Sequence, residues 1–238
     1  MDYQLEQNDV HIWRAHLDWP KDKFDAAFQL LSEEEQARAE RFVIEQHRDR
    51  YIASHAVLHQ ILSLYVNCPP EKLQFHQNDH GKPYIANLPL GLNLQFNMSD
   101  SHDYALYGLR LDDEVGVDLE YMKSKIRAEE IAKRFFSPDE YRALLDLPPS
   151  ERLEGFYRCW SRKEAYIKAI GQGLSFNLSR FSVSLKPDGL SCLLEVDGSA
   201  ELARQWRLGS VSAPEHFQAA LAVEGEVRKI KNFDWSKS

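Results

Sequence analysis

The sequence has few of the features that mark secreted, zinc-binding or membrane proteins. Only three of its 238 residues are cysteines. Cys68, Cys159 and Cys192 form neither a CxxC pair nor a cluster with histidine, so neither a disulfide framework nor a zinc site is predicted. No apolar run approaches the roughly 20 residues that span a bilayer. The N-terminus also lacks the basic and apolar regions of a signal peptide. We therefore expect a cytoplasmic protein with no membrane partner.

The chain also lacks an excess of basic residues. Its formal net charge is -8 at pH 7, whereas proteins that bind nucleic acids or membrane surfaces use a basic face to neutralise phosphate. We expect no nucleic-acid partner, and any phosphate chemistry must use a local basic patch. The composition, 43% hydrophobic and 28% charged, is ordinary for a globular protein with one large or two small cores.

Helix and strand signals follow a similar order in the two halves of the chain. Ser32 with Glu35, and Ser137 with Glu140, form capping-box patterns that predict helix starts. Longer helices are predicted over 46–66 and 150–169, the second closed by Gly171. Short strands are predicted at 73–76, 92–97, 104–110, 181–185, 193–196, 205–211 and 216–223. The repeat of about 105 residues indicates two copies of one α/β (α+β) unit, with a ligand site where they meet.

The stretch GVDLEYM, residues 116–122, carries two acids inside a strand-like run. Side chains alternate in a strand, so Asp118 and Glu120 share one face about 7 Å apart, while Val117 and Leu119 lie on the opposite, apolar face. A solvated strand face is the simplest interpretation of this pattern alone. Two like charges at this spacing repel, however, and a hard cation such as Mg²⁺ relieves the repulsion through oxygen ligands.

A third carboxylate lies on a predicted helix, within WSRKEAYIKAIGQGL at 160–174. Glu164 and Lys168 are four residues apart and share one helix face. A surface ion pair is the simple alternative, and it would contribute only about a few tenths of a kcal/mol. Between 155 and 186, however, six residues are basic and one is acidic in a chain that is acidic overall. This asymmetry indicates an anionic partner, with Lys168 and Lys163 as candidates for phosphate contact.

Two loops of the first half add polar groups. HGKPY at 80–84 contains a glycine that permits close backbone approach and Lys82, a point charge suited to phosphate. NMSDS at 97–101 offers the hydroxyl groups of Ser99 and Ser101. Neither loop matches a Walker or a dinucleotide-binding motif, so nucleotide sites of those classes are not predicted.

Taken in order, GKPY, FNMSDS, GVDLE, RFFSPDEY and WSRKEAYIKAIGQGL resemble the motifs of the Sfp-type 4′-phosphopantetheinyl transferases. The most specific part is GVDLE followed by WSRKEAYIK. The resemblance implies one chain of two similar subdomains, 1–113 and 114–238, related by a pseudo-twofold axis and monomeric. Coenzyme A and Mg²⁺ would bind between them. Such enzymes move the phosphopantetheine arm of coenzyme A onto a serine of an apo acyl or peptidyl carrier protein and release adenosine 3′,5′-bisphosphate.

Carried onto this chain, the resemblance assigns roles to particular residues. Asp118, Glu120 and Glu164 would hold the metal. Asp118, Glu164 and Lys168 would form the catalytic group, with Glu164 as general base, directly or through a metal-bound water, and Lys168 on the phosphate. The positions expected to bind coenzyme A are Arg38, Arg50, Lys82, Pro83, Ser99, Asp100, Ser101, Asp118, Lys163, Glu164 and Lys168.

One position departs from the family pattern. Where the family usually has Ser-His-Ser, this chain has Ser99-Asp100-Ser101, and an ionised aspartate there would repel a diphosphate. We expect Asp100 to weaken coenzyme A binding or to turn away from it, with His102 as a partial substitute.

Other functions use the same features. A Mg²⁺-dependent phosphohydrolase would direct water to a nucleotide diphosphate such as coenzyme A, and a non-catalytic binding module would have lost activity through Asp100. Retention of the three acids and Lys168 favours the transferase. A carrier protein would dock through its acidic helix on the basic segments 155–186 and 123–127.

Overall fold

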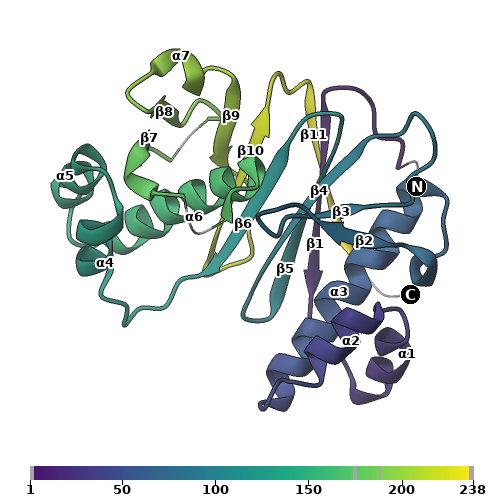
Figure 1. The fold of residues 1–238 in the computed structure, drawn as a ribbon. Coiled ribbons are helices and arrows are strands. Elements are labelled where there is room, and N and C mark those ends of the chain that lie inside the picture. The colour runs from purple at the N-terminus through teal and green to yellow at the C-terminus, as the bar shows by residue number, and fades with distance from the viewer. Residues whose placement is uncertain (1–2, 174–175, 188, 236–238) are drawn as a thin grey trace.

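Two sheets form the frame of the computed structural model, which describes residues 3–173, 176–187 and 189–235 (Figure 1). The first sheet has the strand order β11-β1-β5-β4 and the second β6-β10-β9. The first contains β1 (Asp9–His16), β4 (Leu94–Ser101), β5 (Tyr104–Leu111) and β11 (Lys229–Trp235). The second contains β6 (Val115–Tyr121), β9 (Trp206–Ser210) and β10 (Phe217–Glu224). Two small hairpin sheets pair β2 (Phe75–Gln77) with β3 (Pro83–Ile85) and β7 (Phe181–Val183) with β8 (Leu193–Val196).

Helices accompany each sheet. The first sheet is accompanied by α1 (Phe24–Phe28), α2 (Glu33–Ala39) and α3 (Glu45–Val66). The second is accompanied by α4 (Ala128–Phe135), α5 (Pro138–Asp146), α6 (Arg152–Ile170) and α7 (Ala200–Ala203). Short 3₁₀ turns cover Lys21–Lys23, Pro70–Lys72 and Leu178–Arg180. Among the described residues, no helix has the length and apolar character needed to cross a membrane.

The strand order repeats in the two halves. In the first, the middle position belongs to β5, between β1 and β4; in the second it belongs to β10, between β6 and β9. In each unit the first strand is followed by helices and then by a hairpin, β4–β5 or β9–β10, whose last strand lies between the first strand and the other strand of the hairpin. The topology supports the predicted pair of similar α/β subdomains.

The buried apolar side chains form three clusters. One joins α3 to the first sheet and includes Ile61 and Tyr107. A second joins α6 to the second sheet. The third lies between the sheets, where Ile12 and Leu106 meet Val117 of β6. The apolar face predicted for β6 therefore packs against the first subdomain, which leaves Asp118 and Glu120 on the face toward α6.

Most of the predicted elements are present. Both capping boxes form, at the starts of α2 and α5, and both long helices lie within a few residues of their predicted bounds. Gly171 ends α6 in the left-handed conformation, with φ of 64°. β4, however, continues through Ser101, beyond its predicted end at residue 97.

Three strands were not predicted: β3, which begins inside the expected loop 80–84, and the strands β1 and β11. β1 and β11 pair in parallel, from Asp9 with Lys229 to Ala15 with Trp235. β11 thus lies in the first sheet although it follows residue 114, so the expected division at residues 113 and 114 does not describe this last strand.

Candidate functional site

The two subdomains meet where β4 lies beside β6, and side chains make the connection. Alternate β4 side chains accept hydrogen bonds from alternate backbone N–H groups of β6. The distances are 2.9 Å from Val117 N to Asn97 Oδ1, 3.2 Å from Leu119 N to Ser99 Oγ and 3.0 Å from Tyr121 N to Ser101 Oγ. We call these three bonds the seam. They explain why β4 runs through the polar NMSDS stretch, since its serines and asparagine satisfy backbone groups of the neighbouring strand.

Close packing brings α6 onto β6. A Cβ on Gly116 would lie 2.2 Å from the carbonyl oxygen of Ala165 and 2.4 Å from the backbone nitrogen of Ala169. Only glycine leaves room for the helix backbone at this distance. Gly116 is two residues before Asp118 on the same face of the strand, so the close approach brings Glu164 and Lys168 of α6 to the acidic face.

Asp118 is the centre of the resulting polar cluster. Its side chain is 4% exposed, and its Oδ1 accepts hydrogen bonds from Lys168 Nζ at 2.7 Å and from Ser99 Oγ at 3.2 Å. Lys168 Nζ also donates to Ser99 Oγ at 2.8 Å. Asp118 Oδ2 and Glu164 Oε1 are buried and have no hydrogen-bond partner in the described structure.

Two of the three carboxylates, Glu120 and Glu164, have raised pKa values. Burial, and then the neighbouring Asp118, raise the pKa of Glu120 to about 7. The same two causes, in the same order, raise the pKa of Glu164. Trp160 donates a hydrogen bond to Glu120, and this contact opposes the rise. Buried acids with raised pKa values and unsatisfied oxygens are characteristic of functional sites.

The donor set fits a hard divalent cation, because Mg²⁺ takes a few carboxylate oxygens and completes its shell with water and phosphate. The ligand atoms of the three carboxylates nevertheless lie farther apart than those of a closed metal site. Within the described part of the chain, one group of three His, Cys, Asp or Glu residues has all its ligand atoms within 4.8 Å of one another, and that group is His16, Asp18 and Asp103. At the acidic cluster, the Lys168 ammonium supplies the cation nearest to Asp118.

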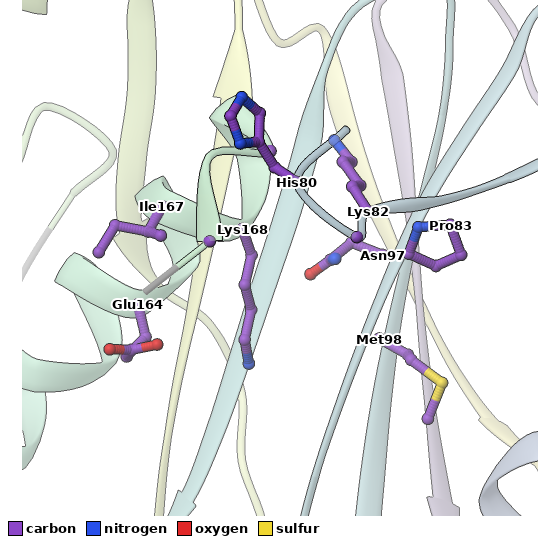
Figure 2. A pocket seen from close by; sticks show the side chains of 11 residues that line it. His80, Lys82, Pro83, Asn97, Met98, Glu164, Ile167 and Lys168 are labelled. Carbon is purple, nitrogen blue, oxygen red and sulfur yellow. The ribbon is translucent and has the colours of Figure 1, made fainter. Parts of the chain in front are cut away.

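A cavity of about 290 Å³ opens beside this cluster, between the two subdomains. Glu164 and Lys168 extend into it from α6, while Lys82 approaches from the loop before β3, Pro83 from the start of β3 and Met98 from β4 (Figure 2). The predicted junction of the two halves is therefore hollow and lined by candidate residues from both.

A larger cavity of about 620 Å³ adjoins the first and lies in the N-terminal subdomain. The two cavities share the lining residues Gly81, Pro83 and Met98. Arg38 and Asp100 both line the larger one. Asp100 thus faces this cavity and lies on the side of β4 opposite the seam, as strand alternation requires.

The expectation that Lys163 contacts phosphate is wrong. Its side chain is fully buried, and its Nζ donates to Glu140 Oε1 at 2.6 Å and to the carbonyl oxygen of Phe181 at 2.7 Å. Neighbouring Arg162 is also buried and donates to the carbonyl of Ser184. Both cations are therefore engaged in the interior of the C-terminal subdomain, and neither lines the smaller cavity as the described residues outline it.

Three other candidates already have partners within the protein. Lys82 lines the smaller cavity, but its ammonium pairs with Glu114 and donates to the carbonyl of Ala169 at 2.8 Å. Arg50 forms a fork with Asp18, at 2.7 and 2.9 Å, and lines neither cavity as the described residues define them. Ser101 contributes its hydroxyl oxygen to the seam.

His102 does not substitute for the family histidine. It lies in the turn after β4, where its Nδ1 is 2.7 Å from Asp103 Oδ1 and its ring stacks on Tyr121 at 4.7 Å. Sequence reasoning also missed Tyr51 and His55, which line the larger cavity from α3. Both occur within the predicted helix 46–66, but periodicity gives no sign that these two aromatic rings face a cavity.

Comparisons with known proteins agree with this architecture. The family model described as "4'-phosphopantetheinyl transferase superfamily" matches residues 114–222, and that described as "4'-phosphopantetheinyl transferase, N-terminal" matches 17–108. The chain is 34% identical to 4'-phosphopantetheinyl transferase HetI of Nostoc sp., over 93% of this chain and 90% of HetI. It is 32% identical to 4'-phosphopantetheinyl transferase Sfp of Bacillus subtilis, over 76% of this chain and 79% of Sfp.

A solved structure described as the Chronobacterium ammoniagenes ACPS-CoA complex is 24% identical and has a TM-score of 0.35. It covers 49% of this chain and 98% of its own, a likeness too partial to bear on function. The sequence relatives extend over both subdomains and the cavity between them. The chain belongs to the Sfp-type family of 4′-phosphopantetheinyl transferases.

Proposed function

We propose that the enzyme transfers 4′-phosphopantetheine from coenzyme A to a serine of an apo carrier protein, with Mg²⁺ as cofactor and adenosine 3′,5′-bisphosphate as the second product. One observation carries the proposal: Asp118 and Glu164 present unpartnered buried oxygens beside the Lys168 ammonium, at the edge of a cavity between the subdomains. This is the combination of groups that a diphosphate and its counter-ion require.

The two adjoining cavities offer separate places for the two phosphate groups of coenzyme A, the diphosphate and the 3′-phosphate. Arg38 in the larger cavity is suited to the 3′-phosphate, since a guanidinium binds phosphate through paired N–H groups. Lys168, near the smaller cavity, is suited to the diphosphate. Pro83 and Met98 line both cavities and supply apolar contact between these two ends.

The chemical step requires a proton acceptor and stabilisation of charge on the departing group. The serine Oγ attacks the β-phosphorus, its proton passes to Glu164, and the bond from that phosphorus to the bridging oxygen breaks. The bridging oxygen leaves on adenosine 3′,5′-bisphosphate. A raised pKa makes Glu164 a better base near neutral pH, and Lys168 stabilises the charge that develops on the phosphates.

Asp118, Glu120 and Glu164 would hold Mg²⁺, which when bound neutralises diphosphate charge and polarises the phosphoryl oxygens. Ser99 supports this arrangement because its hydroxyl fixes the orientation of Asp118. The seam therefore positions a proposed ligand as well as joining the subdomains.

The carrier protein is proposed to dock beside the end of β6. Lys123 and Lys125 are exposed and line a cavity of about 460 Å³ together with Tyr121 and His216. The segment 155–186 contributes less than expected, since several of its cations are already engaged: Arg158 pairs with Glu154, Arg180 pairs with Asp197, and Arg162 and Lys163 are buried. We expect the segment 123–127 to make most of the contact with the acidic helix of a carrier.

The test is mass spectrometry of a panel of apo carrier proteins after incubation with coenzyme A and Mg²⁺. We expect a gain of one phosphopantetheine group on at least one carrier. Asp118→Ala should abolish the gain, while Asp139→Ala, at an exposed position on α5, should retain it. Cleavage of coenzyme A with no gain of mass on any carrier would instead identify a phosphohydrolase.

The docking surface has its own test. Lys123→Glu and Lys125→Glu should raise the Michaelis constant for the carrier and leave that for coenzyme A unchanged. Lys72→Glu is the matched control, at an exposed position of the N-terminal subdomain. Added salt should raise the carrier constant in the same way. A carrier constant unaffected by both charge reversals would show that docking lies elsewhere.

A further inference from the structure

A second cluster of metal-ligating side chains lies outside the proposed active site. His16 is the last residue of β1, Asp18 follows two residues later, and Asp103 lies in the turn between β4 and β5. Among the residues that the structure describes, these three form the one group whose ligand atoms all lie within 4.8 Å of one another. The prediction of no zinc site rests on the positions of the cysteines, and this cluster contains none.

The backbone holds the cluster in place. His16 is paired with Tyr104 in the β1–β5 register, and the N–H of Leu17 donates to the carbonyl oxygen of Asp103 at 2.8 Å. The His16 ring also packs edge-on against Tyr104, with ring centroids 5.0 Å apart. The chain segments that carry the three ligands are therefore fixed by strand pairing and a direct hydrogen bond, so little backbone order is lost when a ligand binds.

A second imidazole lies at the same carboxylate. His102 Nδ1 is 2.7 Å from Asp103 Oδ1, and His16 Nε2 is 3.3 Å from Asp103 Oδ2. Each contact requires a proton on the ring nitrogen. A metal ion can replace such a proton, because it binds the same nitrogen lone pair that the proton occupies. Stacking of His102 on Tyr121 limits the movement that its ring would need.

The donor types select the class of metal. Imidazole nitrogen combined with carboxylate oxygen is a ligand set of Zn²⁺ and neighbouring transition metals, whereas Mg²⁺ and Ca²⁺ take oxygen ligands. The side chains of His16 and His102 are 48% and 49% exposed, which leaves room for water to complete the coordination shell. The cluster therefore differs in chemistry from the all-carboxylate group at Asp118.

Arg50 supports the cluster from α3. Its guanidinium forms a fork with Asp18, with Nε to Oδ1 at 2.7 Å and Nη2 to Oδ2 at 2.9 Å. Each carboxylate oxygen retains a further lone pair for a metal. The fork fixes the orientation of Asp18, as outer hydrogen bonds do for metal ligands in general, and it explains why Arg50 is held away from the two cavities.

From this geometry we propose that His16, Asp18 and Asp103 bind a divalent transition-metal ion of the zinc class, with His102 as a fourth ligand or a hydrogen-bond partner of Asp103. The bound ion would join the end of β1 to the β4–β5 turn. It would thereby stabilise the strand that carries Ser99 and the seam.

The experiment is titration of the full-length enzyme with ZnCl₂ by isothermal calorimetry, without coenzyme A. We expect a saturable equivalent of Zn²⁺ whose affinity falls at least about tenfold in His16→Gln and in Asp103→Asn. His216→Gln is the matched control, since His216 is an exposed histidine 3.6 Å from Glu215, and it should bind as the parent does. Co²⁺ absorption in the visible range gives a second readout of nitrogen ligation.

Glu164→Gln separates this site from the acidic cluster. The His16-dependent equivalent should persist in that variant. Unchanged Zn²⁺ affinity in His16→Gln and Asp103→Asn would overturn the proposal, and so would binding that is lost in Glu164→Gln but kept in His16→Gln. Phosphopantetheine transfer is not the readout, so the outcome is independent of the proposed function.

Discussion

The Lys168 ammonium lies 2.7 Å from the Asp118 carboxylate and 2.8 Å from the Ser99 hydroxyl. One cation thus contacts both strands of the seam from α6. Without a bound metal, the Lys168 ammonium neutralises part of the charge on the acidic face. It also lies at the edge of the cavity that would receive a diphosphate.

Removal of this cation should impair catalysis more than folding. We expect Lys168→Met to lower kcat/KM for transfer by about 10²–10³-fold, the range for loss of one group that stabilises transition-state charge. The measurement is steady-state transfer at varied coenzyme A. Lys133→Met, at an exposed position on α4, is the matched control and should leave kcat/KM unchanged. Equal effects of the two substitutions would contradict a role for Lys168 in the site.

The buried Lys163–Glu140 pair should instead govern stability. Lys163→Met leaves the Glu140 charge buried without its partner, which costs about 3–5 kcal/mol of unfolding free energy. The double variant Lys163→Met/Glu140→Gln removes both charges and should recover part of that loss. Urea denaturation measures each variant. A double variant less stable than Lys163→Met would show that the unpaired charge is not the cause.

Gly116 offers a test of the contact between strand and helix. In Gly116→Ala the added methyl would meet the backbone of α6, so the helix must shift and we expect a loss of about 1–3 kcal/mol together with reduced transfer activity. Gly155→Ala is the control, because the nearest atom there is the end of the Leu147 side chain, which can move. Thermal unfolding and transfer rate should both distinguish the two variants.

Asp100 should weaken coenzyme A binding through its charge. It lines the larger cavity with Arg38, where a phosphate is proposed to bind. We expect Asp100→His to tighten coenzyme A binding about fivefold, equivalent to ~1 kcal/mol for one charge contact near the surface. Calorimetric titration gives the dissociation constants, with Asp139→His as the control. Identical constants for Asp100→His and the parent would refute the charge argument.

The buried His11 predicts sensitivity to acid. Burial, and then the charge of Lys231, lower the pKa of His11 to about 4, and its Nε2 has no hydrogen-bond partner in the described structure. The His11 ring takes up a proton near pH 6.5 in the unfolded chain and near pH 4 in the folded chain. Above pH 6.5 the ring is neutral in both states and does not reduce the unfolding free energy. As the pH falls from 6.5 to 4, protonation of the unfolded chain lowers the unfolding free energy by about 3 kcal/mol in total.

His11→Phe should remove the His11 part of the pH dependence, so that on going from pH 6.5 to 4.5 the variant loses less unfolding free energy than the parent. The raised pKa of Glu120, about 7, acts in the opposite direction in both proteins, and Glu35, whose pKa is about 2, responds at lower pH. Part of the slope should remain, since burial also lowers the pKa of His55. His76→Gln, at an exposed position, is the control. An unchanged slope in His11→Phe would assign the acid sensitivity to other groups.

Sequence reasoning succeeded where local chemistry decides the structure. Ser32 and Ser137 cap helices through contacts three residues away, and alternation along β6 separates Asp118 from Val117. It failed where the partner is distant in sequence. Lys163 and Lys168 are both lysines on one helix, yet only Lys168 reaches the cavity. The difference depends on Glu140, which lies 23 residues before Lys163 and faces it only after folding.

The seam has a consequence for how such a site tolerates change. Asn97, Ser99 and Ser101 bind the main chain of β6, which is the same whatever side chains that strand carries. The three bonds to the main chain of β6 therefore do not depend on which side chains stand at positions 118 and 120, although the Ser99 hydroxyl also donates to Asp118. We expect replacement of those acids to leave the two halves joined, so that the chemistry of the cleft can vary on a constant framework.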